Sequence, residues 1–241
     1  MGEFDLSGVL TQLLDDAQKF DGETASTRNL IDPFAAVLET VLMEYKTREE
    51  WLQAEHQRTR QKALMNLIGN LQQSIIGKLP GWTAYKTGTD MPDVVGNRGQ
   101  QMFICEVKNK HNTMNARMAA ATYDALAEFL SRPEFGGYTA AVVAVTSPVR
   151  RGSYFKPFAP PRKPERLDII SMSGRVFYAL ATDPQNRIPY KSVQPNDPMH
   201  LWESWSAIDL MLKEFWNELE IQTGYAVPIW IQNLSEQAVG T

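Results

Sequence analysis

The first third of the chain carries apolar residues at spacings of three and four. This pattern is typical of amphipathic helices, and it covers residues 7–20, 29–45 and roughly 48–79. In the third segment we expect one buried stripe, made of Leu64, Leu67, Ile68, Leu71, Ile75 and Ile76. Pro80 cannot continue a helix, so this segment should end between Gly77 and Gly81.

Beyond residue 81 the apolar spacing falls to two, which predicts strands at 82–86, 92–95 and 101–108. Gly96, Asn97 and Gly99 favour a turn, so the second and third strands should form a hairpin. A helix over 116–130 follows, with Asn115 or Thr113 as its N-cap. The apolar run 139–146 then predicts a fully buried strand.

The last hundred residues contain fewer clear patterns. Residues 147–165 are rich in proline and predict a loop, followed by a strand at 167–171 and a short helix around 175–181. An amphipathic helix over 201–219 and a last strand at 226–232 complete the series. The order of elements predicts an α/β fold with a helical N-terminal extension.

Charge is unevenly distributed along the 241 residues. The whole chain has 24 basic and 28 acidic residues, a net charge of −4. Residues 51–165 hold 15 basic against 8 acidic residues, whereas both ends are acidic. Because a polyanion responds to local potential, a basic middle is compatible with nucleic-acid binding, although a solvated mixture of charges is the alternative.

Composition excludes several other classes. Cys105 is the single cysteine and there are three His, so neither an intramolecular disulfide nor the usual four-ligand zinc site can form. No apolar run approaches the roughly 18 residues of a membrane helix. The N-terminal residues lack the features of a signal peptide, so we expect a cytoplasmic protein without a membrane partner.

Three side chains of the predicted hairpin should lie on one face. Alternation along the strand 101–108 places Glu106 and Lys108 together, and a symmetric hairpin places Asp93 opposite Ile104 or Glu106 on that face. Two carboxylates can hold a hard divalent cation, and a lysine can position or deprotonate water, which suits phosphodiester hydrolysis. A solvated face or a surface ion pair is the alternative.

The sequence Pro92-Asp93 followed by Glu106-Val107-Lys108 resembles the P-D...(D/E)-x-K nuclease signature. The stretch VKNKHNTMN at 107–115 resembles the catalytic block of type II restriction endonucleases that cut the interrupted palindrome GGNCC. Segments 29–34 and 175–183 are similar to further parts of that family. The resemblance spans about residues 29–185 and leaves roughly the last 55 unmatched.

This resemblance implies a restriction-endonuclease-like core, a central mixed sheet flanked by helices, and a Mg²⁺-dependent DNA endonuclease. Asp93, Glu106 and the Val107 carbonyl are the implied metal ligands, and Lys108 is the implied catalytic residue. One nuclease domain over 1–241 is expected, with a helical part at 1–58, a catalytic core at 59–172 and a helical part at 173–241. Gln72 and Gln73 lie where related nucleases carry an accessory metal-site residue.

Polar and basic residues around this block are candidate contacts to double-stranded DNA: Asn109, Lys110, His111, Asn112, Arg117, Arg150 and Arg151. The asparagines could instead cap helices or stabilise turns, and His111 could be an ordinary hydrogen-bonding residue. The basic loop 147–165 could be an irregular connection.

A palindromic site is matched most simply by two-fold symmetry, so a homodimer is expected, with a cognate DNA methyltransferase as its system partner. Two rival hypotheses assume the same fold but a different function. One is a structure-specific repair or junction-resolving nuclease, and the other is a non-catalytic DNA-binding protein.

Overall fold

The computed structural model describes residues 6–22, 33–85, 88–110, 114–146, 155–182 and 213–231. Three helices come first: α1 (Ser7–Gly22), α2 (Pro33–Leu42) and α3 (Arg48–Ile76). The strands are β1 (Trp82–Ala84), β2 (Val94–Arg98), β3 (Gln101–Lys110), β4 (Thr139–Thr146), β5 (Phe155–Pro157) and β6 (Ile169–Ser173). Between and after them lie α4 (Ala116–Ser131), the 3-10 turn η1 (Pro133–Phe135) and α5 (Gly174–Thr182).

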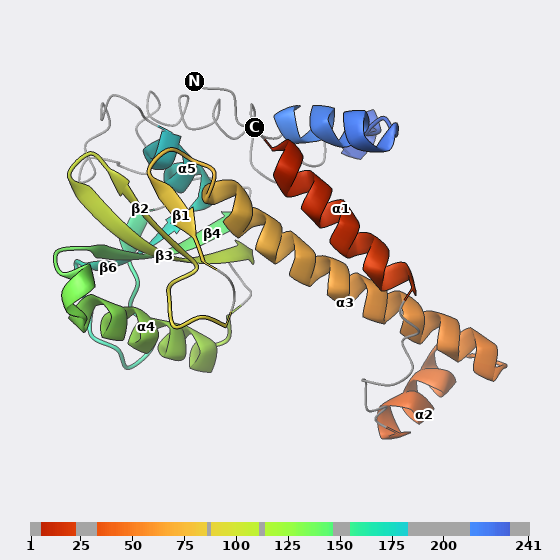
Figure 1. The fold of residues 1–241 in the computed structure, drawn as a ribbon. Helices are drawn as coiled ribbons and strands as arrows, with labels where there is room; N and C mark the ends of the chain where they lie inside the picture. Colours follow the sequence, from red (N-terminus) through yellow and green to blue (C-terminus); the bar gives the residue numbers. More distant parts are fainter. Residues whose placement is uncertain are drawn as a thin grey trace. The chain divides into compact units, whose positions relative to one another are not determined.

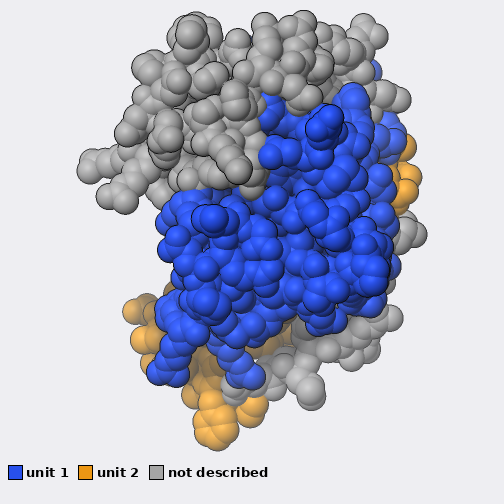
Figure 2. All heavy atoms as spheres, turned by 90° about the vertical axis from the view of Figure 1, so that its left-hand side faces the viewer, with its two compact units in different colours: residues 1–10, 69–241 blue, residues 11–68 orange. Residues whose placement is uncertain are grey.

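The chain divides into two compact units (Figure 2). The larger unit combines residues 1–10 with 69–241, and the smaller unit is 11–68, so the boundary falls within α3. The larger unit contains all six strands and both α4 and α5. None of the helices that the structure describes is both long enough and apolar enough to cross a membrane.

A six-stranded mixed sheet in the order β1-β2-β3-β4-β6-β5 forms the centre of the larger unit. Strands β3, β4 and β6 are parallel, while β1–β2, β2–β3 and β5–β6 pair antiparallel. Helix α4 lies on one side of this sheet and α5 on the other (Figure 1). The predicted fold class, a mixed sheet flanked by helices with a helical N-terminal part, is therefore confirmed.

Each face of the sheet has its own core. On the α4 face, Ile104 of β3 packs in a buried cluster with Tyr123 and Leu126 of α4. On the α5 face, Trp82 stacks on Phe103 at 6.1 Å between ring centroids and meets Phe177 edge-on at 4.9 Å. Because side chains alternate along β3, Glu106 and Lys108 continue the α4 face beyond Ile104.

Helix α4 begins directly after Asn115, one of the two N-cap residues that the sequence suggests. Asn115 Oδ1 accepts a hydrogen bond from the backbone N–H of Met118 at 2.9 Å, which satisfies one of the free donors of the first turn. The helix ends at Arg132, whose extended backbone is the conformation expected for a residue before proline.

The hairpin is confirmed, but its turn is shorter than predicted. Strand β2 continues to Arg98, which pairs with Gln101, so the turn is Gly99-Gln100 and Gly99 has φ of 59°. Gly96 lies within the strand and not in the turn. A side-chain carbon at Gly96 would lie 2.2 Å from the indole of Trp82, so glycine is required there by the close approach of that ring.

Several predicted boundaries were wrong for identifiable reasons. Residues 147–165 include the edge strand β5, which ends at Pro157, where a missing N–H is tolerated. Residues 229–231 form a helical turn that starts after Pro228, and no strand occurs in 226–231. Leu64 is 49% exposed, and the buried residues of α3 begin only at Leu67. The larger unit resumes two residues later, at Gly69. Of the helix predicted at 201–219, the described part is helical over 213–223.

Replacing Gly96 by alanine should destabilise the protein, because the added carbon would displace the buried indole of Trp82 from Phe103 and Phe177. We expect a loss of about 2 kcal/mol or more in the free energy of unfolding, measured by urea denaturation. Gly8→Ala in α1 is the control, because a side-chain carbon there meets no atom within 4 Å. Equal stability of the two variants would contradict this interpretation of the hairpin.

Candidate active site

Asp93 lies beside β3 because of the register between β2 and β3. Val94 pairs with Cys105, so Asp93, one residue before the strand, faces the position of Glu106. Asp93 Oδ2 accepts a hydrogen bond from the backbone N–H of Val107 at 2.8 Å. The Asp93 carbonyl accepts another from the N–H of Tyr85 at 2.9 Å. Of the two registers left open by the sequence, the structure has the one that places Asp93 opposite Glu106.

Lys108 completes a group of three charged side chains on the α4 face. Its Nζ lies 2.5 Å from Glu106 Oε1, and the two side chains are 25% and 28% exposed. The pair is two residues apart on one strand, so pleating alone brings both side chains to the same face. The structure thus brings together Asp93, Glu106 and Lys108, the three residues that the sequence selected as catalytic.

The contact between the two acids changes the titration of Asp93. Burial and, after it, the charge of Glu106 raise the pKa of Asp93 to about 6, against the lowering effects of the Val107 N–H and Lys108. Two adjoining carboxylates remain ionised together only when a cation compensates their charge. The site therefore favours either a shared proton or a bound cation near neutral pH.

The donor set fits a hard divalent cation. Within the part of the chain that the structure describes, no group of three or more His, Cys, Asp and Glu side chains could hold a metal ion. A cation on this face would take oxygen from Asp93 and Glu106 and fill its other positions with a backbone carbonyl or water, as Mg²⁺ commonly does. Val107, which would supply the carbonyl, is buried and already gives its N–H to Asp93.

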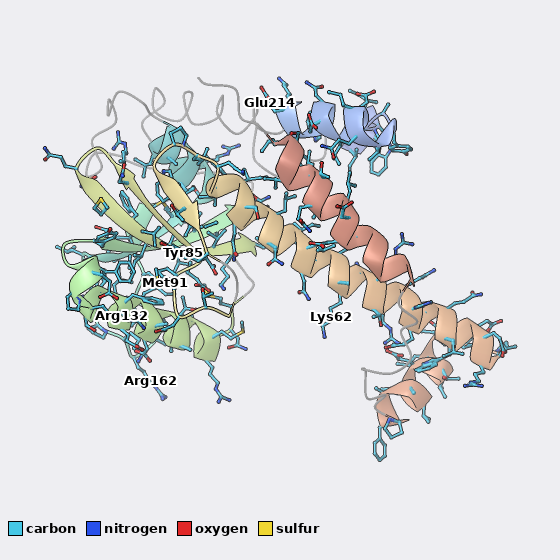
Figure 3. All side chains as sticks on the ribbon, in the orientation of Figure 1. Lys62, Tyr85, Met91, Arg132, Arg162 and Glu214 are labelled. Carbon is cyan, nitrogen blue, oxygen red and sulfur yellow. The ribbon has the colours of Figure 1, made fainter. Side chains whose placement is uncertain are left out.

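The loop before Asp93 is anchored to the end of α4. Arg132 Nη2 donates to Asp90 Oδ1 at 2.9 Å, and Nη1 donates to the Asp90 carbonyl at 3.2 Å. Its guanidinium lies 4.6 Å from the ring centre of Phe129 and lowers the pKa of Asp90. Met91 packs against the α4 core cluster, and Figure 3 shows Met91 and Arg132 on this side of the sheet. These contacts restrain the segment that carries Asp93.

Sequence reasoning did not find Arg132, and no local signal could have found it. Asp90 and Arg132 are 42 residues apart, and each alone looks like an exposed charged residue in a polar turn. Only the packing of α4 on the sheet brings them together.

The structure describes three of the seven predicted DNA contacts, Asn109, Lys110 and Arg117. Lys110 at the end of β3 and Arg117 in the first turn of α4 are exposed. Asn109 points away from Lys108 by strand alternation and lies near Gly69 of α3, with its Nδ2 3.9 Å from where a side-chain carbon on Gly69 would be. His111, Asn112, Arg150 and Arg151 lie outside the described residues.

Gln72 has a structural contact. Its Oε1 accepts a hydrogen bond from the hydroxyl of Tyr178 at 3.1 Å, and this contact joins the C-terminal part of α3 to α5. Burial raises the pKa of Tyr178, so its hydroxyl remains a proton donor at neutral pH. Gln72 therefore satisfies a buried hydroxyl, and Gln73 is half-buried beside it.

Asp93→Asn should stabilise the metal-free protein in a pH-dependent way. The pKa of Asp93 in the fold lies above its usual value, so ionisation of Asp93 destabilises the fold, with no effect below pH 3.8 and the full effect above about pH 6. The free energy of unfolding of Asp93→Asn minus that of the unsubstituted protein should increase by about 2 kcal/mol from pH 4 to pH 7.5. Both values are measured by urea denaturation in EDTA.

Asp90→Asn is the control for this measurement and should show the opposite trend. The pKa of Asp90 is lowered by Arg132, so ionisation of Asp90 stabilises the fold and its loss matters more as pH rises. A difference between Asp93→Asn and the unsubstituted protein that does not vary with pH would show that burial and Glu106 do not raise the pKa of Asp93.

Comparison with known proteins connects this geometry to a family. The model of the Eco47II restriction endonuclease family matches residues 5–191, which include Asp93, Glu106 and Lys108. The chain is 30% identical over 234 residues to the type II restriction enzyme Eco47II of Escherichia coli, covering 93% of this chain and 90% of that enzyme. It is 25% identical over 184 residues to the type II restriction enzyme Sau96I of Staphylococcus aureus, covering 74% and 68%. The chain therefore belongs to the Eco47II restriction endonuclease family.

Proposed function

We propose that this type II restriction endonuclease hydrolyses double-stranded DNA in a Mg²⁺-dependent reaction at an interrupted palindrome of the GGNCC type. The observation that carries the proposal is the convergence of Asp93, Glu106 and Lys108 on one face of adjacent strand ends. The family membership supports site-specific cleavage of DNA. The GGNCC assignment is supported by the resemblance of residues 107–115 to the catalytic block of enzymes that cut that site.

Each residue of the group has a distinct proposed role. Asp93 and Glu106 hold the cation through carboxylate oxygens, together with the Val107 carbonyl. When bound, the cation stabilises negative charge on the scissile phosphate and favours ionisation of the attacking water. Lys108 orients that water in line with the P–O3′ bond. The water oxygen bonds to phosphorus and loses a proton to solvent as the P–O3′ bond breaks. The 3′ oxygen takes up a proton from solvent and leaves as a 3′ hydroxyl, and the 5′ phosphate remains on the other product strand.

DNA contacts are proposed from the exposed cations near this group. We propose that Lys110 and Arg117 contact phosphates, because both are exposed and flank the segment between β3 and α4. Asn109, His111, Asn112, Arg150 and Arg151 remain predicted contacts. We also propose a single nuclease domain, a homodimer that matches the palindrome, and a cytoplasmic location together with a methyltransferase that protects the host's own sites.

The alternatives are less well supported. A junction-resolving or repair nuclease could use the same three residues, but the relatives in this family are type II restriction enzymes. A non-catalytic DNA-binding protein does not require two adjoining half-buried acids, in which burial and the charge of Glu106 raise the pKa of Asp93 to about 6.

Digestion of a defined plasmid tests the proposal. With Mg²⁺ we expect discrete fragments whose ends map to GGNCC sites and carry 5′ phosphates. Excess EDTA should abolish cutting, and Ca²⁺ should permit binding without turnover, because the proposed ligands are hard oxygens. Cutting that persists in EDTA would contradict the metal role. Non-specific degradation or branch-specific cleavage would support the structure-specific alternative.

Lys108→Ala should separate catalysis from binding. A group that acts mainly in the transition state contributes to rate and not to affinity. We expect the cleavage rate at saturating DNA to fall by about two orders of magnitude or more, with little change in DNA affinity measured in Ca²⁺.

Lys78→Ala removes an exposed lysine that follows α3 and serves as the charge control. If Lys108→Ala recovers full rate at saturating DNA, Lys108 is a phosphate contact and the catalytic role is wrong.

A further inference from the structure

Helix α2 exposes an unusually apolar face. Five apolar residues at helical spacing are between 59% and 85% exposed: Phe34, Val37, Leu38, Val41 and Leu42. Their positions i, i+3, i+4, i+7 and i+8 form one continuous stripe along the helix. No residue of α2 is buried.

The opposite side of α2 contacts α3. Glu39 forms an ion pair with Arg58 of α3, and this contact raises the pKa of Arg58. Arg58 also contacts Glu55 at 2.5 Å. Ala36, Glu39 and Thr40 are the half-buried residues of α2. Within the unit 11–68, α2 therefore turns its small and polar residues to α3 and its apolar stripe outward, the reverse of the usual arrangement.

An exposed stripe of this kind indicates a binding partner. A ten-residue helix is marginal in water without packing on its apolar face. Five such side chains expose on the order of 500 Å² of apolar surface, which is as large as the largest apolar patch of a typical soluble protein, and such a patch is often functional.

We propose that the α2 stripe is the contact between two copies of this chain, packed about a two-fold axis. Two facing stripes would together bury on the order of 1,000 Å², which reaches the lower limit of a specific interface. Glu39 is the single ionisable residue of α2 and pairs with Arg58, so like charges do not meet across the axis. An antiparallel α2 pair also aligns the helix dipoles favourably.

The chemistry of the stripe disfavours DNA as its occupant. The face has no cation to meet phosphates, and DNA affinity depends on such contacts. The inference rests on the proposed function only in that a palindromic site calls for two copies. The inference adds to that function the surface through which the two copies bind each other.

Sedimentation equilibrium of the full chain tests the interface. We expect a dimer, and Leu38→Glu combined with Val41→Glu should raise the dimer dissociation constant about a hundredfold or more, because four charges would be buried across the axis. Leu167→Glu is the matched control, since Leu167 is 85% exposed in the larger unit and should leave the dimer intact. A monomeric unsubstituted protein, or a glutamate variant that stays dimeric, overturns the inference.

A crosslinking measurement avoids charged substitutions altogether. Leu38 lies at the middle of the stripe, so Leu38→Cys should couple to its counterpart through a short bismaleimide, whereas Leu167→Cys should not. Cys105 is buried and should not react. Failure of Leu38→Cys to crosslink at concentrations where the protein is dimeric overturns the α2 assignment.

Plasmid cleavage by the unsubstituted protein, measured in parallel, separates the two proposals. A monomer that cuts at GGNCC sites contradicts the interface and the proposed homodimer, and leaves the proposed cleavage reaction standing. A dimer that dissociates as predicted but leaves DNA uncut contradicts the proposed function alone.

Discussion

The antiparallel pairing of β2 with β3 is the constraint on which the site depends. The two-residue turn Gly99-Gln100 sets the register, and the close approach of Gly96 to Trp82 fixes which side of β2 faces α5. In that register Asp93 faces Glu106 and accepts a hydrogen bond from the backbone N–H of Val107. A slip of one residue would move the Asp93 side chain to the α5 face, among the aromatic rings, and would separate the two carboxyl groups.

This placement reduces stability in the metal-free protein. Asp93 is half-buried beside Glu106, and burial together with the charge of Glu106 raises its pKa to about 6, so ionisation of Asp93 lowers the free energy of unfolding. Lys108 compensates part of that charge through its contact with Glu106, and Arg132 and Met91 hold the preceding loop in place. The same arrangement that destabilises the metal-free fold provides two hard oxygen ligands beside the ammonium group of Lys108, a combination suited to phosphodiester hydrolysis.

The sequence predicted the parts of the fold that follow from local periodicity. Alternation in β3 put Glu106 and Lys108 on one face, and Asn115 was one of two caps considered for α4. It could not predict contacts between distant positions, such as Asp90 with Arg132 or Gln72 with Tyr178, because neither partner carries a local signal. Periodicity identified α2 as amphipathic, yet the direction of its apolar face depends on the ion pair between Glu39 and Arg58.

We propose that Asp93 and Glu106 bind one divalent cation where β2 begins beside β3. Anomalous diffraction from crystals soaked in Mn²⁺ tests it most directly, because it locates the ion without reference to activity. We expect a peak in contact with carboxylate oxygens of both Asp93 and Glu106 and with the Val107 carbonyl. A peak bound to other residues, or no peak beside these carboxylates at a saturating concentration of Mn²⁺, would contradict it.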